Sequence, residues 1–336
     1  MYKGSTVGVV VPAYNEQGFV GTVIETIPAF VDRIYVVDDC STDGTWAEIQ
    51  HHAATADPVA NATFAVPDGG AASVRRVVPI RHDRNRGVGG AIRTGYRRAR
   101  TDGIDVTAVM AGDGQMDPDR LDRLIDPVVD GAADYAKGNR LLHRPHREAM
   151  SSWRCFGNSL LTLLTRVASG YWRTGDPQNG YTAISREALS SLDLSALYEG
   201  YGFLNDLLIR LNARELRVAD VGMPAVYGEE RSTINYSQFV PALSALLLRG
   251  FLWRMKRKYV DHGIHPVALA SLFGVLGVGS GTLPLVRSLL STDDSEPRVL
   301  QIGAGVLAVL VGWACFLMAV TFDRWESEEI EEKQYR

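Results

Sequence analysis

The sequence predicts an α/β domain with a mostly parallel sheet, followed by a membrane-associated C-terminal region. Short apolar runs alternate with segments of helical spacing through most of the 336-residue chain, and this alternation is typical of βαβ units with right-handed crossovers. The apolar runs end in polar clusters, and the strand ends of an open α/β sheet form the edge at which ligands bind. Two long apolar stretches without charged side chains follow near the C-terminus.

The expected strands and helices follow one another in a regular order. Strands are predicted at residues 7–11, 34–37, 74–80, 104–109 and 133–136. Helices are predicted at residues 20–27, about 45–52 and 87–100, and in segments that open near Pro118, Arg154 and Tyr201. The alanine-rich stretch at 53–73, which contains prolines and a glycine pair, is predicted to be a loop.

The stretch at residues 110–118 is the centre of the predicted site. It places two hard oxygen ligands, Asp113 and Gln115, directly after the strand at 104–109, and Pro118 suits the first turn of the next helix. Mg²⁺ or Mn²⁺ usually takes one or two protein oxygens and completes its shell with phosphate oxygens and water. The pattern therefore indicates a metal and phosphate site. A capped strand-to-helix turn remains the alternative at this point.

Composition and motif spacing exclude several other classes. A net charge of −4 leaves no global footprint for nucleic acid, and the scattered Cys40, Cys155 and Cys315 favour neither zinc nor a disulfide framework. Residues 87–90 (GVGG) lack the third glycine of a dinucleotide fingerprint and follow the third strand, and there is no P-loop motif. These glycines let a helix N-terminus approach a nucleotide, or they allow tight helix packing.

The C-terminal region has the properties of a two-span membrane hairpin. Residues 264–286 and 299–322 are each long enough to cross a hydrocarbon core of roughly 30 Å. Four glycines in the first stretch suit close helix packing in lipid: Gly274, Gly277, Gly279 and Gly281. A buried hairpin of a soluble protein is the alternative. Contact through these helices would also allow a homo-oligomer.

The flanking charges predict the orientation of the hairpin. Residues 239–259 combine apolar side chains with a basic set, as in helices that lie in the headgroup plane: Arg249, Arg254, Lys256, Arg257 and Lys258. This basic end precedes the first span, which places it in the cytosol, with residues 287–298 outside and the acidic tail inside again. The N-terminus lacks the features of a signal peptide. We therefore expect a multi-pass protein of the cell membrane with its catalytic domain and both termini in the cytosol.

These observations divide the chain into four expected parts. They are a cytosolic α/β domain at 1–236, an amphipathic basic interfacial helix at 237–260, a transmembrane hairpin at 261–323 and an acidic tail at 324–336.

Three motifs resemble those of family 2 glycosyltransferases. They are residues 12–16 (PAYNE), 37–45 (VDDCSTDGT) and 113–115 (DGQ), which match in order and spacing. The likeness is closer to the branch of dolichol-phosphate mannosyl- and glucosyltransferases, and it covers roughly residues 5–235. It implies a GT-A fold, a nucleotide-sugar donor, a divalent metal (Mg²⁺ or Mn²⁺) and inversion at the anomeric carbon.

Carried over by position, the resemblance implies roles for residues along the donor site. Pro12, Tyr14 and Glu16 would line the base and ribose, Val37 and Asp39 would fix the base, and Gly112, Asp113 and Gln115 would form the donor and metal segment. Asp38 is expected to be a structural residue at a strand end, and Asp117 a helix cap. Ala111 replaces the first aspartate of the family's Asp-x-Asp. We expect an active enzyme with a looser metal site; a catalytically inactive relative is the alternative.

The second half of the expected site lies in the middle of the chain. Arg140 closes a segment that resembles the family's Gly-x-Arg, whose arginine meets phosphate. Arg154 is a weaker second candidate for a phosphate, with a solvated helix arginine as the alternative. Residues 176–181 resemble the turn beneath the family's acceptor site. Asp206 would be either a base or a helix cap. In the acceptor-side loop Thr233 stands where lysine is usual, which leaves Arg231 to hold the acceptor phosphate.

The chemistry of the acceptor separates the functional hypotheses. A hydroxyl acceptor needs a base, whereas a phosphate monoester is already ionised and needs only cations. Because the membrane segments favour a lipid phosphate, we expect transfer of a hexose from a donor of the UDP-glucose or GDP-mannose type to a polyprenyl (dolichyl) phosphate at the cytosolic face, for glycan or protein glycosylation. The alternatives are a hydroxyl of a lipid-linked saccharide or glycolipid as acceptor, and a non-catalytic nucleotide-sugar-binding scaffold.

Overall fold

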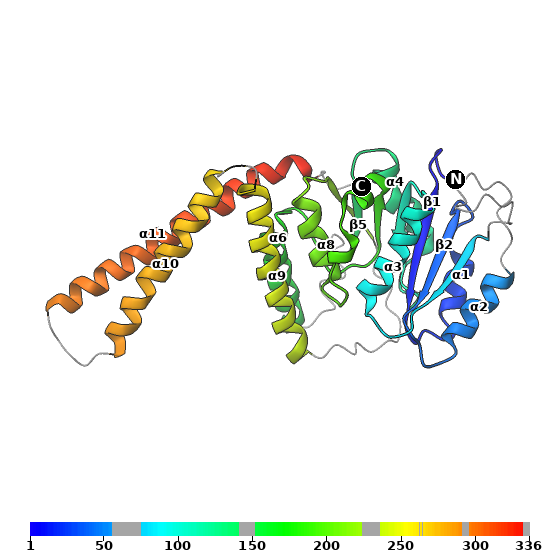
Figure 1. The fold of residues 1–336 in the computed structure, drawn as a ribbon, viewed down its shortest axis with the longest axis horizontal. Helices are drawn as coiled ribbons and strands as arrows, with labels where there is room; N and C mark the ends of the chain where they lie inside the picture. Colours follow the sequence, from blue (N-terminus) through cyan, green and yellow to red (C-terminus); the bar gives the residue numbers. More distant parts are fainter. Residues whose placement is uncertain are drawn as a thin grey trace. The chain divides into compact units, whose positions relative to one another are not determined.

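The computed structural model describes residues 1–55, 75–140, 152–223, 236–261, 263, 265–290 and 296–331. The chain divides into two compact units (Figure 1), one of Met1–Gly250 with Ile330–Arg336 and one of Phe251–Glu329. This division differs from the boundaries expected from the sequence. The first unit includes part of the expected interfacial helix and also the segment that follows the hairpin.

One mixed sheet forms the centre of the first unit. In the described part of the chain it has seven strands in the order β3-β2-β1-β4-β6-β5-β7, namely β1 (Val7–Ala13), β2 (Arg33–Asp38), β3 (Val77–Arg81), β4 (Val106–Val109), β5 (Tyr135–Asn139), β6 (Thr182–Ser185) and β7 (Val218–Gly222). Only β6 runs against its neighbours, β4 and β5. The predicted mostly parallel sheet is therefore confirmed.

Helices cover both faces of this sheet (Figure 1). Val9 and Val11 of β1 belong to one buried cluster, together with side chains from α1 (Val20–Thr26), α2 (Thr45–Thr55) and α4 (Leu121–Val129). Val10 belongs to a second cluster, together with α3 (Val88–Thr101), α7 (Arg186–Ser191) and α8 (Phe203–Asn212). Successive side chains of a strand point to opposite faces. The continuous apolar run of β1 therefore reflects burial on both sides.

The helix α9 (Tyr236–Tyr259) begins as a packed helix of the first unit. A Cβ added at Gly250 would lie 2.5 Å from Ile209 of α8, and Leu243 and Leu247 are only 6% and 5% exposed. Leu248 and Leu252 remain exposed, at 62% and 57%. The expected interfacial helix therefore uses part of its apolar surface to pack on protein and exposes the remainder.

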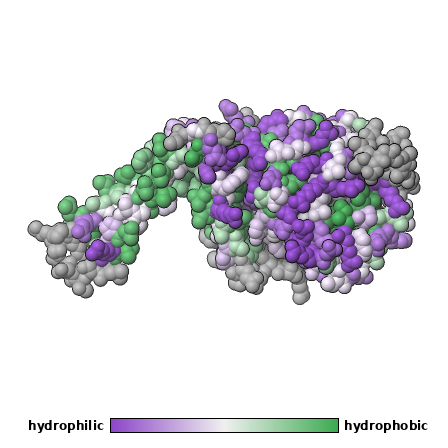
Figure 2. Space-filling model, viewed as in Figure 1, coloured by the Kyte–Doolittle hydropathy of each residue, from purple (hydrophilic) through white to green (hydrophobic). Residues whose placement is uncertain are grey.

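Two long apolar helices dominate the second unit. α10 (Pro266–Leu290) and α11 (Glu296–Ser327) are long and apolar enough to cross a membrane. In the most apolar part of each helix only 11% of the residues of α10 and 17% of those of α11 are buried, which does not suit the core of a soluble protein. Hydrophobic residues lie along their surface in Figure 2.

Glycines bring these two helices into close contact. A Cβ at Gly277 would lie 2.8 Å from the Cα of Gly312, and one at Gly281 would lie 2.5 Å from the carbonyl oxygen of Gly305. Such distances are too short for any side chain. The expectation that these glycines serve helix packing is therefore confirmed for Gly277 and Gly281.

A buried ion pair joins α9 to α11 within the second unit. Both terminal nitrogens of Arg254 donate to the carboxylate of Asp323, at 2.7 and 2.8 Å, and the hydroxyl of Tyr259 donates to the same carboxylate at 2.7 Å. Arg254 is fully buried. Its expected role as one of the basic side chains facing lipid headgroups is therefore wrong, because a carboxylate inside the protein already pairs with its charge.

Replacement of Arg254 by alanine should destabilise the second unit. The change leaves Asp323 buried without its cation, and breaking such a pair costs about 3–5 kcal/mol. The measurement is the thermal midpoint of the full chain in detergent. Arg257→Ala is the matched control: its side chain is 56% exposed and pairs with Asp261 at 3.4 Å, so its loss should cost about 1 kcal/mol or less. Equal shifts for the two variants would contradict the structural role of Arg254.

Candidate functional site

The carboxyl ends of three parallel strands bring the predicted donor residues together. The amide of Asp39, after β2, donates to the carbonyl of Ala13 at 2.9 Å, and the amide of Gly112, after β4, donates to the carbonyl of Pro12 at 3.0 Å. The segments after β1, β2 and β4 therefore meet at one edge of the sheet. Pro12 is buried there, whereas the side chain of Tyr14 is 45% exposed.

The turn after β1 is fastened to the loop after β2. Asn15 has a left-handed backbone (φ 56°), and its side-chain oxygen accepts a hydrogen bond from the amide of Thr42 at 2.9 Å. Its own amide donates to the hydroxyl of Ser41 at 3.0 Å, and the amide of Glu16 donates to the hydroxyl of Thr45 at 2.8 Å. The first two motifs therefore form one rigid surface.

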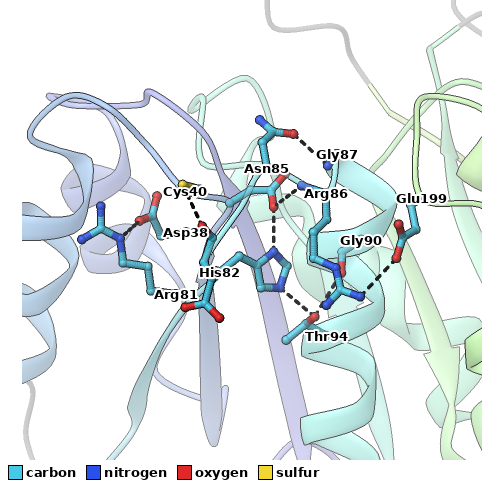
Figure 3. Close-up of polar contacts among 12 residues, drawn as sticks. Asp38, Cys40, Arg81, His82, Asn85, Arg86, Gly87, Gly90, Thr94 and Glu199 are labelled. Carbon is cyan, nitrogen blue, oxygen red and sulfur yellow. Dashed lines mark hydrogen bonds and ion pairs between the residues drawn. The ribbon is translucent and has the colours of Figure 1, made fainter.

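Asp38 has a structural role at the end of β2, as expected. It is fully buried, and one oxygen accepts a hydrogen bond from the amide of Ser41 at 3.0 Å. The other oxygen, Oδ2, lies 3.0 Å from Nε of Arg81 (Figure 3). The two groups form an ion pair, but their geometry does not meet that of a hydrogen bond.

Asp39 is held by a histidine that the sequence analysis did not single out. Nδ1 of His82 lies 2.6 Å from Oδ1 of Asp39, and the amide of Arg86 donates to the same oxygen at 2.9 Å. The other ring nitrogen of His82 lies 2.8 Å from the hydroxyl of Thr94 (Figure 3). Among the described residues no hydrogen bond reaches Oδ2 of Asp39. That oxygen therefore remains available to a ligand.

The segment after β4 has the geometry of a short, partly buried turn. Oδ1 of Asp113 accepts a hydrogen bond from the amide of Gln115 at 3.0 Å, and Gly114 adopts φ 73°. Burial raises the pKa of Asp113. Oδ1 of Asp117 accepts from the amide of Asp119 at 3.0 Å, so Asp117 caps the following 3₁₀ turn as expected. Within the described ranges no three His, Cys, Asp or Glu side chains form a complete metal site.

Arg140 and Asp176 form a bidentate ion pair at the end of β5. Nε and a terminal nitrogen of Arg140 donate to the two oxygens of Asp176, at 2.7 and 2.9 Å. Burial alone would raise the pKa of Asp176, but the hydrogen bonds and charge of Arg140 outweigh it and lower that pKa. The side chain of Arg140 stays 41% exposed. The two motifs expected on the phosphate side are therefore in direct contact.

The glycines of the third loop pack against protein. A Cβ at Gly89 would lie 2.6 Å from the carbonyl oxygen of Tyr198, and one at Gly87 would lie 2.8 Å from that of Glu199. The carboxylate of Glu199 pairs with Arg93 and with Arg86, the latter at 3.3 Å (Figure 3). Of the two interpretations of these glycines, the structure favours tight packing, although the partner is the segment before α8.

Asp206 is engaged in contacts that hold this same segment. Its Oδ2 accepts hydrogen bonds from the amide of Tyr198 at 3.0 Å and from Nε of Arg210 at 2.9 Å. The side chain is buried in the first turn of α8. These contacts favour the structural interpretation of Asp206 over that of a base.

Two predicted phosphate ligands cannot be placed. Arg154 lies in the first turns of α6 (Ser152–Ser169), but its side chain is outside the described part of the chain. Arg231 and Thr233 also lie outside the described residues.

The fold and the strand-edge site define a GT-A-like α/β protein, and comparison with known proteins identifies its family. The model of glycosyl transferase family 2 matches residues 8–193. The chain belongs to this family, and it is a glycosyltransferase. The family resemblance noted in the sequence is therefore confirmed.

Several characterised relatives are similar over most of their length. The UDP-N-acetylglucosamine–dolichyl-phosphate N-acetylglucosaminyltransferase of Methanococcus voltae is 28% identical over 221 residues, which are 66% of this chain and 85% of the relative. The polyprenol monophosphomannose synthase of Mycolicibacterium smegmatis is 32% identical over 230 residues, 63% of this chain and 74% of the relative. The undecaprenyl-phosphate mannosyltransferase of Micrococcus luteus is 29% identical over 238 residues, 66% and 83%.

A solved structure confirms the fold. The crystal structure of the glucosyl-3-phosphoglycerate synthase of M. tuberculosis superposes with a TM-score of 0.51 and 22% identity, and covers 75% of this chain and 81% of that chain.

Replacement of Gly89 by alanine should disturb the packing of α3 on the segment before α8. The new methyl group meets backbone oxygens that cannot move independently, so we expect a loss of about 1–3 kcal/mol in the free energy of unfolding. Gly157→Ala in α6 is the matched control. Its Cβ meets nothing within 4 Å, so the same change should stabilise by up to about 1 kcal/mol. Thermal midpoints that shift in the same direction would contradict this packing.

Proposed function

We propose that this glycosyltransferase moves a hexose from a nucleotide-sugar to a polyprenyl phosphate at the membrane surface. The observation that carries the proposal is the presence, in one chain, of a donor-type strand edge and two exposed helices of membrane length. A polyprenyl acceptor has its reactive phosphate at the membrane and its chain within it. The names of three relatives, which specify dolichyl, undecaprenyl and polyprenol phosphates or their products, support this choice of acceptor.

The donor base is proposed to bind over the first two strand ends. Within the described ranges His82 and Arg86 bond only Oδ1 of Asp39, which leaves Oδ2 to accept a ring N–H. Val37 would contact the base beside it, and Pro12, Tyr14 and Glu16 would line the base and ribose. Both uracil and guanine carry a suitable N–H, so UDP-glucose and GDP-mannose are the two donor types to test.

The turn at Asp113 fits a divalent cation shared with the donor phosphates. A carboxylate and an amide oxygen are hard ligands, and Mg²⁺ or Mn²⁺ with few protein ligands completes its shell with phosphate and water. Partial burial leaves the charge of Asp113 poorly solvated and raises its pKa, and a cation there would offset that cost. Gly112 would let the phosphates approach, and Gln115 would supply the second oxygen. Such an ion neutralises charge on the departing nucleoside diphosphate.

A bound metal also has support among proteins of the same fold. The glucosyl-3-phosphoglycerate synthase of M. tuberculosis is described in complex with Mn²⁺ and UDP. Ala111 removes one further carboxylate from the turn. We propose that the metal site of this protein is weaker for that reason but still supports catalysis.

The acceptor is proposed to approach from the side of Arg140. Asp176 orients its guanidinium, the side chain is 41% exposed, and a planar guanidinium suits phosphate oxygens. Arg231 and Arg154 are proposed as further acceptor ligands. A phosphate oxygen can attack the anomeric carbon directly, with inversion and without loss of a proton. The structural engagement of Asp206 agrees with a reaction that needs no base.

Exposed apolar side chains support a membrane-facing surface on the first unit. Leu160, Leu163 and Leu164 of α6 are 44%, 50% and 43% exposed, which is unusual for leucine on one helix. Three basic side chains of α9, Arg249, Lys256 and Arg257, are exposed, whereas that of Lys258 is only 7% exposed and pairs with Glu326. We propose that these helices rest on the cytosolic leaflet of the cell membrane, with α10 and α11 spanning it and both termini in the cytosol.

The direct test of this function is product formation. Membranes containing the full chain would be incubated with a panel of labelled nucleotide-sugars and polyprenyl phosphate. A lipid product labile to mild acid is expected, because a sugar linked through its anomeric carbon to phosphate hydrolyses readily. A stable glycolipid product would instead indicate a hydroxyl acceptor, and no product with any donor would favour a binding scaffold.

Removal of the metal or of its carboxylate should stop turnover. Asp113→Asn lowers the negative charge of the site, and chelation removes the ion, so both should abolish transfer because the leaving diphosphate loses its counter-charge. Activity after chelation should return on addition of Mg²⁺ or Mn²⁺. Turnover at the wild-type rate in EDTA would disprove the metal assignment.

Two further variants separate a phosphate acceptor from a hydroxyl acceptor. With a phosphate, Asp206→Asn should cost little beyond its effect on the thermal midpoint, whereas Arg231→Ala should weaken use of the lipid much more than binding of the donor. With a hydroxyl, loss of a base should cost at least about two decades in turnover. The measurements are turnover and donor affinity for both variants. A crippled Asp206→Asn with an unchanged thermal midpoint, beside a near-normal Arg231→Ala, would rule out the lipid phosphate.

A further inference from the structure

The turn that carries Asp176 is held by charged side chains from several parts of the chain. The amides of Trp172 and Arg173 donate to the carboxylate of Glu331. The carbonyl of Thr174 accepts from Nε of Arg166 at 2.9 Å. Exposed loops usually leave such backbone groups to water. Here the backbone polar groups are satisfied by side chains, which fixes the path of the turn.

Two residues of the sheet hold the last part of the same turn. The amide of Gly175 donates to Oδ2 of Asp220 at 2.7 Å, and its carbonyl accepts from Nζ of Lys137. Lys137 and Asp220 are both buried, and Nζ of Lys137 lies 3.4 Å from Oδ1 of Asp220. The next residue, Asp176, has the left-handed value of φ 42° that non-glycine residues seldom adopt. The surrounding contacts therefore impose the backbone conformation from which Asp176 reaches Arg140.

Glu331 comes from beyond the two long apolar helices. It is separated from Trp172 by 159 positions, yet it belongs to the same compact unit. It is only 6% exposed, forms a parallel bridge with Val218 at the open edge of β7, and follows Ile330, which packs on the core. The sequence predicted an acidic cytosolic tail at 324–336, whose run of glutamates is typical of a surface in contact with water. Glu331 departs from this pattern, because it is buried and both of its oxygens accept hydrogen bonds from backbone amides.

The burial of this carboxylate is unfavourable by itself. Loss of water raises the pKa of Glu331 to about 7, although the amides of Arg173 and Trp172 act in the opposite direction. Exposed glutamates lie directly before it, among them Glu329. An acidic tail does not require any of its glutamates to be buried. The particular position of Glu331 therefore points to a role in the turn that it holds.

We propose that Glu331 is a positioning residue for the phosphate side of the active site. It fixes the start of the turn at 172–176, the turn fixes Asp176, and Asp176 orients Arg140. The segment after the hairpin thereby completes the catalytic unit. This inference rests on the proposed function, because it takes Arg140 to contact phosphate. The contact by which Glu331 holds the turn can be tested separately.

The first test measures the hold directly. Hydrogen–deuterium exchange of the full chain in nanodiscs would be compared for wild type, Glu331→Ala and the matched control Glu329→Ala. Exchange at the amides of Trp172 and Arg173 should become faster in Glu331→Ala and stay unchanged in Glu329→Ala, because only the first variant removes their acceptor. Unchanged exchange in Glu331→Ala would overturn the proposal, whatever reaction the protein catalyses.

The second test measures the catalytic consequence. For Glu331→Ala we expect kcat to fall by about ten- to a hundredfold, as for other small displacements of catalytic groups, while the Kd of the nucleoside diphosphate stays unchanged. Glu331→Gln retains one oxygen acceptor and should lose less. A general loss of structure would lower nucleotide binding and kcat together, and that result would overturn a positioning role. Wild-type kcat in Glu331→Ala would overturn it as well.

A double-mutant comparison tests whether Glu331 acts through Asp176. If Glu331 acts through Asp176, the variant that combines Glu331→Ala with Asp176→Ala should be no slower than Asp176→Ala alone. Multiplicative losses would show that the two residues act independently and would overturn the proposed route. Absence of any lipid product in wild type would refute the proposed function and leave the exchange result to decide the hold on the turn.

Discussion

The parallel pairing of β1 with β2 and with β4 is the constraint on which the site depends. In this register Ala13 lies opposite Asp38, and Val10 lies opposite Val109. All three strands therefore end at one edge, and their next residues can bond across it, as the amides of Asp39 and Gly112 do. A shift by one residue would turn every strand side chain to the other face. Close packing opposes that shift, because a Cβ added at Gly95 of α3 would lie 2.3 Å from Cγ1 of Val10, so the core also fixes the ligand edge.

The donor half of the site could be predicted from the sequence because local patterns determine it. Apolar runs locate β1, β2 and β4, and the residues after them carry the motifs, so the placement of Asp39 and Asp113 at the ligand edge follows from the sequence alone. The sheet beyond β4 was less predictable. β6 has only four residues, and β5 buries Lys137 and Asn139 on its inner positions. Polar residues in a buried strand weaken the apolar pattern, and only the tertiary partners Asp220 and Gly175 explain them.

The residues that sequence reasoning missed are those whose partners lie far along the chain. His82 follows β3 at the same edge as Asp39, a placement that could have singled it out once the sheet order was assumed. Arg254 and Glu331 gave no such signal. Each stands in a run of like charges, which normally indicates a solvated surface. Their burial depends on a single complementary feature elsewhere: the carboxylate of Asp323 for the first, and two backbone amides for the second.

The two halves of the site differ in how their charges are held. On the donor side, short-range contacts between neighbouring loops suffice. On the proposed acceptor side, the turn that carries Asp176 depends on partners from β5, β7, α6 and the segment after α11. This last dependence also bears on the proposed membrane topology. A chain that leaves the first unit after Gly250 and places Glu331 back in it must return to the side from which it started. A hairpin of two spans meets that requirement and a single span does not. For the proposed membrane hairpin, the contact of Glu331 with Trp172 and Arg173 therefore supports an even number of crossings, independently of the distribution of charge in the flanking loops.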